Sequence, residues 1–150
     1  MATSSSSGST SDSASVGEPD RWRRHDWWGV VLDTDDVETL TMFYAALRGW
    51  RIHHLDEADG SLDPGEGVAY LSIQYNAAYQ RPVWPGRARD QQMMLHLDFE
   101  VTELAAEVDR AVGLGAQLPD HQPQANVRVL LDPAGHPFCL YTTIDRPDLG

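Results

Sequence analysis

The chain has 150 residues, with 11 arginines and no lysine, and its formal net charge at pH 7 is −12. Binding to nucleic acid needs cationic side chains that displace phosphate counterions, so this charge balance argues against it. No segment approaches the roughly 18 consecutive apolar residues of a membrane span, so we expect no membrane insertion. The length predicts one domain with a substantial core.

Both ends of the chain are poor in large apolar side chains. Residues 1–25 contain a serine-rich stretch that buries too little surface to offset its ordering entropy, so we predict a disordered tail there and a loose tail over residues 145–150. The N-terminal stretch lacks the apolar core of a secretory signal, so we expect a cytoplasmic location. Cys139 is the only cysteine, which excludes an intramolecular disulfide and a cysteine-based metal cage.

In the first half of the folded part, the sequence pattern predicts a strand, a helix and further strands. Residues 27–34 are apolar and β-branched, as in a buried strand. Thr34, Asp35 and Asp36 all offer helix N-caps, and Gly49 suits the left-handed residue that ends a helix. Between them, apolar residues at helical spacing form one stripe: Val37, Leu40, Phe43, Tyr44 and Leu47. Residues 50–55 and 68–75 predict strands, residues 56–67 a loop, and residues 76–92 a long ordered loop of the kind that often covers a site.

The second half repeats this order. Residues 94–101 alternate apolar and polar side chains, which predicts a strand with His96, Asp98 and Glu100 on one face. Thr102 is expected to cap a helix that ends near residues 113–115. A short strand over 116–118, a strand over 127–131, a turn over 132–135 and a strand over 138–142 follow.

The two halves therefore match as a duplicated unit. Asp36 corresponds to Thr102 and Gly49 to Gly115 at one constant offset, and each helix is followed by strand-like sequence. We predict an α+β fold over residues 26–144, with two βαβββ modules at about 27–82 and 93–143. Their mixed sheets would curl around a shared cleft.

In this arrangement the chain resembles the vicinal oxygen chelate superfamily, which includes glyoxalases, bleomycin-resistance proteins and extradiol dioxygenases, and within it the glyoxalase-like domain branch. The resemblance covers residues 27–143. It is carried by Val31–Thr34 with Asp36, Phe43–Trp50, Gln91-Gln92, His96–Val101, Leu114–Ala116 and Asp132–Leu140. The combination is specific for the fold and much less so for a reaction.

The resemblance implies where a metal would bind. In metal-using members each module supplies two ligands, one from its first strand and one from its last. The matching positions here are Gly29, Gln74 (or Ser72), His96 and Cys139. Gly29 cannot ligate through a side chain, and neither can Val30 if the register slips by one. A divalent metal, if bound, would be held by His96, Gln74 and Cys139; a lone buried cysteine is, however, more often an inert apolar residue.

A set of six residues is expected to line the cleft for a small-molecule ligand: Ser72, Gln74, Trp84, His96, Cys139 and Tyr141. His96 is the candidate catalytic residue; the alternative is a polar side chain that only hydrogen-bonds its neighbour. Three functions remain open. One is a binding protein with a degenerate metal site that acts on or sequesters a metabolite or drug, as bleomycin-resistance members hold a cationic drug in an acidic cleft. The others are a divalent-metal-dependent lyase or dioxygenase, and a metal-free lyase or isomerase with His96 as acid or base. The resemblance leaves two assemblies open: the modules pair within one chain, or they pair between the two chains of a homodimer.

Overall fold

The computed structural model describes residues 23–143, so most of both predicted tails lies outside the described residues. Two similar halves follow one another along this range. The first contains β1 (Trp28–Thr34), α1 (Val37–Arg48), β2 (Arg51–Leu55), β3 (Asp59–Asp63) and β4 (Ala69–Tyr75). The second contains β5 (Leu97–Glu100), α2 (Leu104–Gly113), β6 (Val127–Leu131) and β7 (Pro137–Tyr141). None of the helices described is both long and apolar enough to cross a bilayer.

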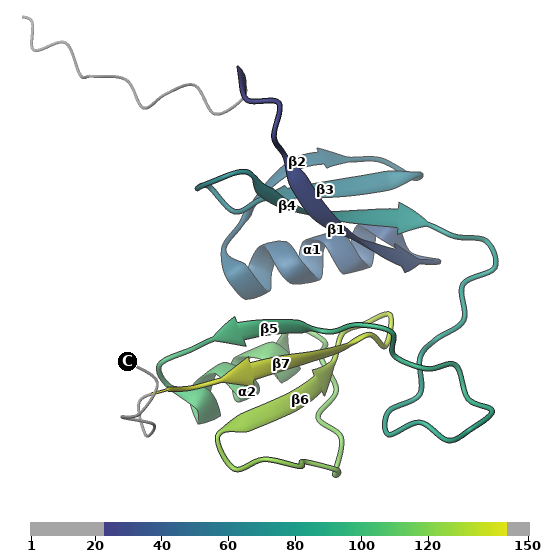
Figure 1. The fold of residues 1–150 in the computed structure, drawn as a ribbon, viewed down its shortest axis with the longest axis vertical. Helices are drawn as coiled ribbons and strands as arrows, with labels where there is room; N and C mark the ends of the chain where they lie inside the picture. Colours follow the sequence, from purple (N-terminus) through teal and green to yellow (C-terminus); the bar gives the residue numbers. More distant parts are fainter. Residues whose placement is uncertain (1–22, 144–150) are drawn as a thin grey trace, which may run out of the picture.

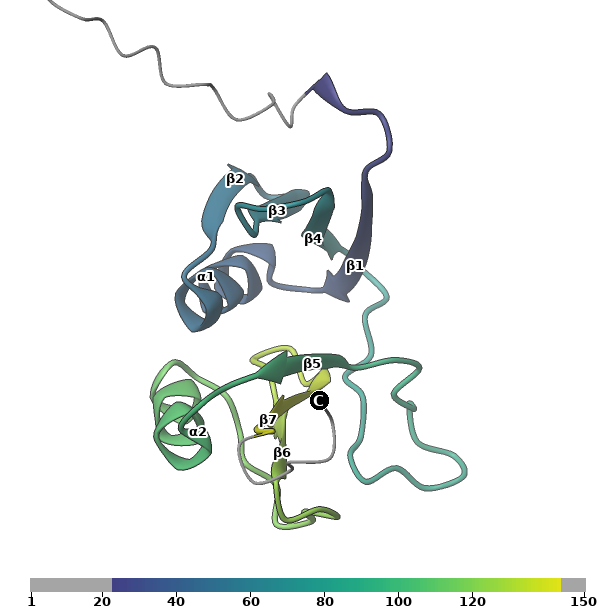
Figure 2. The same ribbon diagram turned by 60° about the vertical axis from the view of Figure 1, so that its left-hand side comes forward.

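Each half builds one mixed sheet with a helix on one face. The first sheet has the strand order β1-β4-β3-β2, with β1 and β4 parallel, and the second has the order β5-β7-β6, with β5 and β7 parallel. Figures 1 and 2 show the two modules stacked, with α1 between the first sheet and β5. The predicted α+β fold of two curled mixed sheets is confirmed.

The sequence signals for α1 act as predicted. The Asp36 side chain accepts a hydrogen bond from the backbone N–H of Thr39 at 3.0 Å, and Gly49 ends the helix in the left-handed region with φ 66°. The whole apolar stripe of α1 is buried. Because α1 lies between the two sheets, this stripe and the residues beside it pack against both the first sheet and the second module.

The predicted loop over residues 56–67 is wrong in part, because it contains β3. Its sequence, Asp-Gly-Ser-Leu-Asp, has low strand propensity, but β3 pairs with both β2 and β4. Gly60 is needed there for space rather than for a turn. A Cβ atom on Gly60 would lie 2.2 Å from the buried Thr41 Oγ1 of α1, so only glycine allows this close approach of helix and strand.

The second module departs from its predicted boundaries in three places. The strand predicted over residues 94–101 is confined to β5, and Met94 and Leu95 are exposed. The N-cap of α2 is Glu103 rather than Thr102, and it makes no side-chain capping bond. The strand predicted over 116–118 is reduced to one bridge between Gln117 and Leu131. The second module is therefore a shortened copy of the first.

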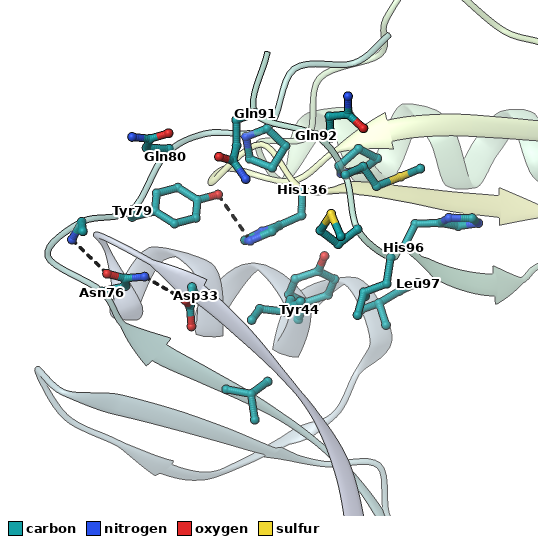
Figure 3. A pocket seen from close by; sticks show the side chains of 18 residues that line it. Asp33, Tyr44, Asn76, Tyr79, Gln80, Gln91, Gln92, His96, Leu97 and His136 are labelled. Atoms are coloured by element: carbon teal, nitrogen blue, oxygen red, sulfur yellow. Dashed lines mark hydrogen bonds between the residues drawn. The ribbon is translucent and has the colours of Figure 1, made fainter. Parts of the chain in front are cut away.

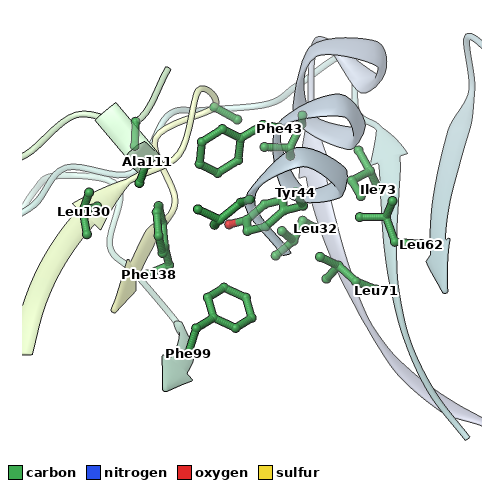
Figure 4. Close-up of a cluster of buried hydrophobic side chains, with 14 of the residues drawn as sticks. Leu32, Phe43, Tyr44, Leu62, Leu71, Ile73, Phe99, Ala111, Leu130 and Phe138 are labelled. Carbon is green, nitrogen blue, oxygen red and sulfur yellow. The ribbon is translucent and has the colours of Figure 1, made fainter. Parts of the chain in front are cut away.

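One continuous core joins the two modules. Figure 4 shows Phe43 and Tyr44 of α1 extending toward Phe138 of β7 and Phe99 of β5. The Phe43 and Phe138 ring centroids are 5.8 Å apart, and those of Tyr44 and Phe99 are 6.3 Å apart. Aromatic pairs at such distances add to the stabilisation from burial. The two modules therefore fold against each other and not as independent units.

A buried polar contact also joins the modules. The Tyr44 hydroxyl donates to Asp132 Oδ2 at 2.8 Å, and neither residue is exposed to solvent. Asp132 lies in the turn before β7, where its carboxylate also contacts His136 Nδ1 at 2.9 Å and accepts from the His136 backbone N–H at 3.0 Å. A buried carboxylate needs such partners to offset its desolvation.

We predict that Tyr44→Phe lowers the free energy of unfolding by about 1–3 kcal/mol, because Asp132 then loses a buried donor while the ring packing is kept. Urea denaturation measures the change. Tyr75→Phe is the matched control: the Tyr75 side chain is 50% exposed, and its substitution should change stability by less than about 0.5 kcal/mol. Equal effects of the two substitutions would contradict the role given to the Tyr44–Asp132 contact.

Candidate functional site

Three candidate ligand side chains meet on the free face of the second sheet. His96 lies just before β5, Asp98 within it, and Cys139 in β7, where Cys139 is the cross-strand partner of Asp98. His96 Nε2 and Asp98 Oδ1 are 3.1 Å apart. One ligand atom from each of the three residues lies within 4.8 Å of the others. The pairing of β5 with β7 brings His96 close to Cys139, two of the residues that the resemblance named as metal ligands. It adds Asp98, which the predicted alternation placed on the same face as His96 but which we had not counted as a ligand.

These residues form the floor of a cavity of about 380 Å³, here called the module-two cavity. Its lining includes Trp84, His96, Asp98, Cys139 and Tyr141, together with Met93, Pro123, Gln124, Asn126, Val127, Val129 and Pro137. Four of the six residues expected to contact a ligand therefore line one cavity. The Trp84 indole Nε1 is buried and has no hydrogen-bond partner among the residues described.

The thiol of Cys139 is held in its protonated form. Burial raises the pKa of Cys139 to about 12, and the charge of Asp98 and a hydrogen bond to that carboxylate contribute in the same direction. The thiolate is the nucleophile and the metal ligand, so Cys139 in this state is neither. A metal ion at this site would have to displace the proton.

The first module places its expected site residues elsewhere. The ring of Tyr70 lies over Gly29: a Cβ atom on Gly29 would be 2.4 Å from Tyr70 Cε2. Ser72 donates to the Gly60 carbonyl at 3.2 Å and lines a separate cavity of about 200 Å³ with His53 and Tyr70. Gln74 is exposed near the end of β4 and does not line the module-two cavity.

A second group of candidate ligands lies at the exposed turn between β2 and β3. It comprises His54, Asp56 and Asp59. Asp56 Oδ1 accepts from the backbone N–H groups of Ala58 and Asp59, and these bonds, with the one to His54, hold the pKa of Asp56 below its usual value. These contacts are typical of a hairpin turn, and they explain why the three side chains lie close together.

Another cavity, of about 360 Å³, lies between the C-terminal half of β1 and the start of β5; we call it the inter-module cavity. Figure 3 shows His136 in its wall, with Tyr79, Asn76 and Asp33 on one side. His136 Nε2 lies 3.3 Å from the Tyr79 hydroxyl, which donates to the Ala134 carbonyl at 2.6 Å. Burial raises the pKa of Tyr44, and the charge of Asp132 and its hydrogen bond raise it further.

The Tyr44–Asp132–His136 network was not predicted from the sequence. Tyr44 is part of an apolar stripe in the sequence, and His136 follows a turn. The one available signal was the spacing of Asp132 and His136, four residues apart across the Asp-Pro-Ala-Gly turn, which brings a carboxylate and an imidazole together. The partner Tyr44 is 88 residues away from Asp132 and only the tertiary packing reveals it.

Comparisons with known proteins show which family the chain matches. Residues 29–141 match the family model described as glyoxalase-like domain. No curated protein matches the sequence.

Solved structures share the fold at low sequence identity. A glyoxalase/bleomycin resistance protein/dioxygenase family enzyme from Burkholderia phytofirmans PsJN has a TM-score of 0.60 and 19% identity, covering 77% of this chain and 97% of its own. A glyoxalase-related enzyme from Fulvimarina pelagi has a TM-score of 0.58 and 18% identity, with coverage of 79% and 88%. The fosfomycin resistance protein FosX from Mesorhizobium loti has a TM-score of 0.56 and 15% identity, with coverage of 79% and 92%.

We predict that Cys139 reacts with iodoacetamide at pH 8 at least about a hundredfold more slowly than glutathione, since its raised pKa leaves very little thiolate. Asp98→Asn should speed the reaction, because removing the neighbouring negative charge lowers the thiol pKa. Mass spectrometry of timed samples measures both rates. Asp109→Asn, on the exposed face of α2, is the control for net charge and should leave the rate unchanged. If Asp98→Asn reacts no faster than wild type, Asp98 does not control the thiol.

Proposed function

The chain belongs to the glyoxalase-like domain family, and from this premise we propose that it binds a small metabolite or drug in the module-two cavity without the four-ligand metal centre of metal-using relatives. The ligand is either sequestered there or transformed, with His96 as the proton-carrying group. The fosfomycin resistance protein among the structural neighbours suggests a drug as one ligand class.

The observation that carries this proposal is the position of Tyr70. Two of the four metal ligands expected from the family would come from module one, at Gly29 and at Gln74 or Ser72. Gly29 has no ligand atom, and the Tyr70 ring occupies the space that a side chain at this position would need. Ser72 donates to the Gly60 carbonyl and lines another cavity, and Gln74 does not line the module-two cavity. These positions support the proposal that the family's divalent centre is not assembled in this chain.

The module-two cavity has the composition of a small-ligand site. Trp84 and Tyr141 supply aromatic surface, and His96 and Asp98 supply polar groups on its floor. The Trp84 indole Nε1–H is buried and has no partner among the residues described, so the ring lines the cavity without a hydrogen bond that fixes it to the protein. Asp98, 3.1 Å from His96 Nε2, can orient the imidazole for proton transfer to or from a bound ligand.

A second function remains because His96, Asp98 and Cys139 lie close enough to hold an ion by themselves. A nitrogen, an oxygen and a sulfur donor form a mixed site of the kind that divalent transition metals accept. Such an ion would supply Lewis-acid polarisation of a ligand oxygen, as in a metal-dependent lyase or dioxygenase. Gln74, the other expected ligand, lies outside this group.

Metal analysis of protein purified without chelator separates the two functions. We expect substoichiometric metal in the wild type, and thermal-shift hits from a metabolite and drug library that are lost in Trp84→Ala and His96→Ala. His54→Ala is the control, because it changes a histidine outside the cavity. Stoichiometric Ni, Zn, Fe or Mn that disappears in His96→Ala but persists in His54→Ala would overturn the metal-free proposal.

The assembly we propose is a homodimer. The free face of the first sheet exposes Val31 and Tyr70, and Trp28 at its edge is 61% exposed. Ser72 lies on this face, outside the module-two cavity. A second copy that covers the face would bury this apolar surface and bring another module-two face to it.

Light scattering after size-exclusion chromatography tests the assembly. We expect a mass of about twice that of the 16.7 kDa chain. Val31→Arg should give monomers, because it places a charge in the proposed interface. Met42→Arg, on an exposed position of α1 outside it, should remain dimeric. A monomeric wild-type protein contradicts the homodimer.

A further inference from the structure

The inter-module cavity carries an unbalanced negative charge. Asp33 is the only acidic side chain in its lining, and no arginine lines it; the chain has no lysine. The partner of the Asp33 carboxylate is neutral, since Asn76 Nδ2 donates to Asp33 Oδ2 at 2.8 Å. Two histidines also line the cavity, but their contacts go to other carboxylates: His96 Nε2 lies 3.1 Å from Asp98, and His136 Nδ1 faces Asp132. Among the residues described, no cationic side chain is therefore paired with Asp33.

The charged groups around Tyr79, in the wall of the cavity, are mostly acidic. Burial raises the pKa of the Tyr79 hydroxyl, and the charge of Asp132 raises it further. Arg81 opposes this, while Asp35 and Asp33 add to it. Arg81 itself is turned to the Pro133 carbonyl, to which it donates at 2.7 Å, and is not in the cavity lining. An anionic ligand would meet repulsion here, and a cationic ligand would be attracted.

The rest of the lining suits the body of a small organic molecule. Met93, Leu97 and Val31 supply apolar surface on the side of β5 and β1. Gln80, Gln91 and Gln92 are exposed and supply carboxamide groups at the mouth. A cavity of about 360 Å³ that combines apolar walls with polar groups has the size of small-molecule sites.

We propose that the inter-module cavity binds a small organic ammonium ion, with its N–H groups donating to the Asp33 carboxylate and its apolar part against Met93 and Leu97. Charge-assisted hydrogen bonds of this kind are about twice as strong as neutral ones. The carboxamides at the mouth complete the polar contacts. This site is separate from the ligand site in the module-two cavity, although Met93, His96 and Pro137 line both cavities. It does not depend on the function proposed for that site.

Benzylamine at pH 7 is a suitable probe, with benzyl alcohol and benzoate as the neutral and anionic molecules of similar shape. Titration of the full-length ¹⁵N-labelled chain, followed by NMR, reports both affinity and location. We expect saturable shifts of the amide signals of Asp33, Asn76 and Gln91 with benzylamine, and at least about tenfold weaker binding of the alcohol and of benzoate.

Three variants sharpen the test. Asp33→Asn keeps the side-chain shape and should weaken benzylamine binding by about tenfold or more. Gln91→Glu adds a carboxylate at an exposed position of the mouth and should tighten binding by about twofold or more. Asp109→Asn removes one negative charge on the far face of α2 and should leave the affinity unchanged.

Several results would overturn the proposal. These are the absence of saturable shifts, equal binding of benzyl alcohol, or unchanged affinity in a folded Asp33→Asn variant. A loss of binding in Asp98→Asn together with full binding in Asp33→Asn would place the amine in the module-two cavity and would also overturn it. None of these results bears on the metal analysis of the other site, so the two proposals fail independently.

Discussion

The carboxylate of Asp132 is the polar centre on which the arrangement of the two modules depends. It is fully buried, and its hydrogen-bond partners come from Tyr44 of the first module and from His136 of its own turn. Burying a carboxylate is costly unless it is paired, and removing one partner costs more than the bond alone contributes. The turn before β7 is thereby held against α1. Since His136 and Pro137 follow this turn directly, the walls of both cavities are positioned by the same contact.

The two cavities differ in chemistry although they share part of their walls. The module-two cavity combines an imidazole, a carboxylate, a protonated thiol and an indole ring. The inter-module cavity has one carboxylate, two imidazoles and several carboxamides. Because Met93 and His96 belong to both, a ligand in one cavity that shifts these side chains changes the affinity of the other. Such coupling is reciprocal by thermodynamic necessity.

The sequence predicted best those elements whose signals are local. The α1 stripe, its Asp36 cap and the Gly49 stop all act within a few residues, and they appear in the structure as predicted. The strand β3 was missed because its sequence is polar and glycine-containing. Its existence depends on pairing with strands on both sides and on the close approach of Thr41 to Gly60. Neither is visible in a five-residue window.

The candidate site was predicted in part for the same reason. Alternation along the strand placed His96 and Asp98 on one face, and the family resemblance named Cys139 as a ligand position on the last strand of module two. Their contact across β5 and β7 comes from the structure. The inter-module cavity was not predicted, because Asp33, Tyr79 and His136 come from a strand end, a loop and a turn with no common sequence pattern. The polar network in the wall of this cavity includes Tyr44, which in the sequence belongs to the apolar stripe of α1.

The tyrosine ring over Gly29 has a consequence for how a metal site could be gained or lost in evolution. A ligand side chain at position 29 meets Tyr70 at 2.4 Å, so that ring has to move or be replaced before the substitution can help. The effects of changes at the two positions are then non-additive, as for other contacting residues. A lineage that gains a ligand at position 29 must therefore alter Tyr70 first or at the same step, and the order of mutations, not only their identity, limits the route to a metal site.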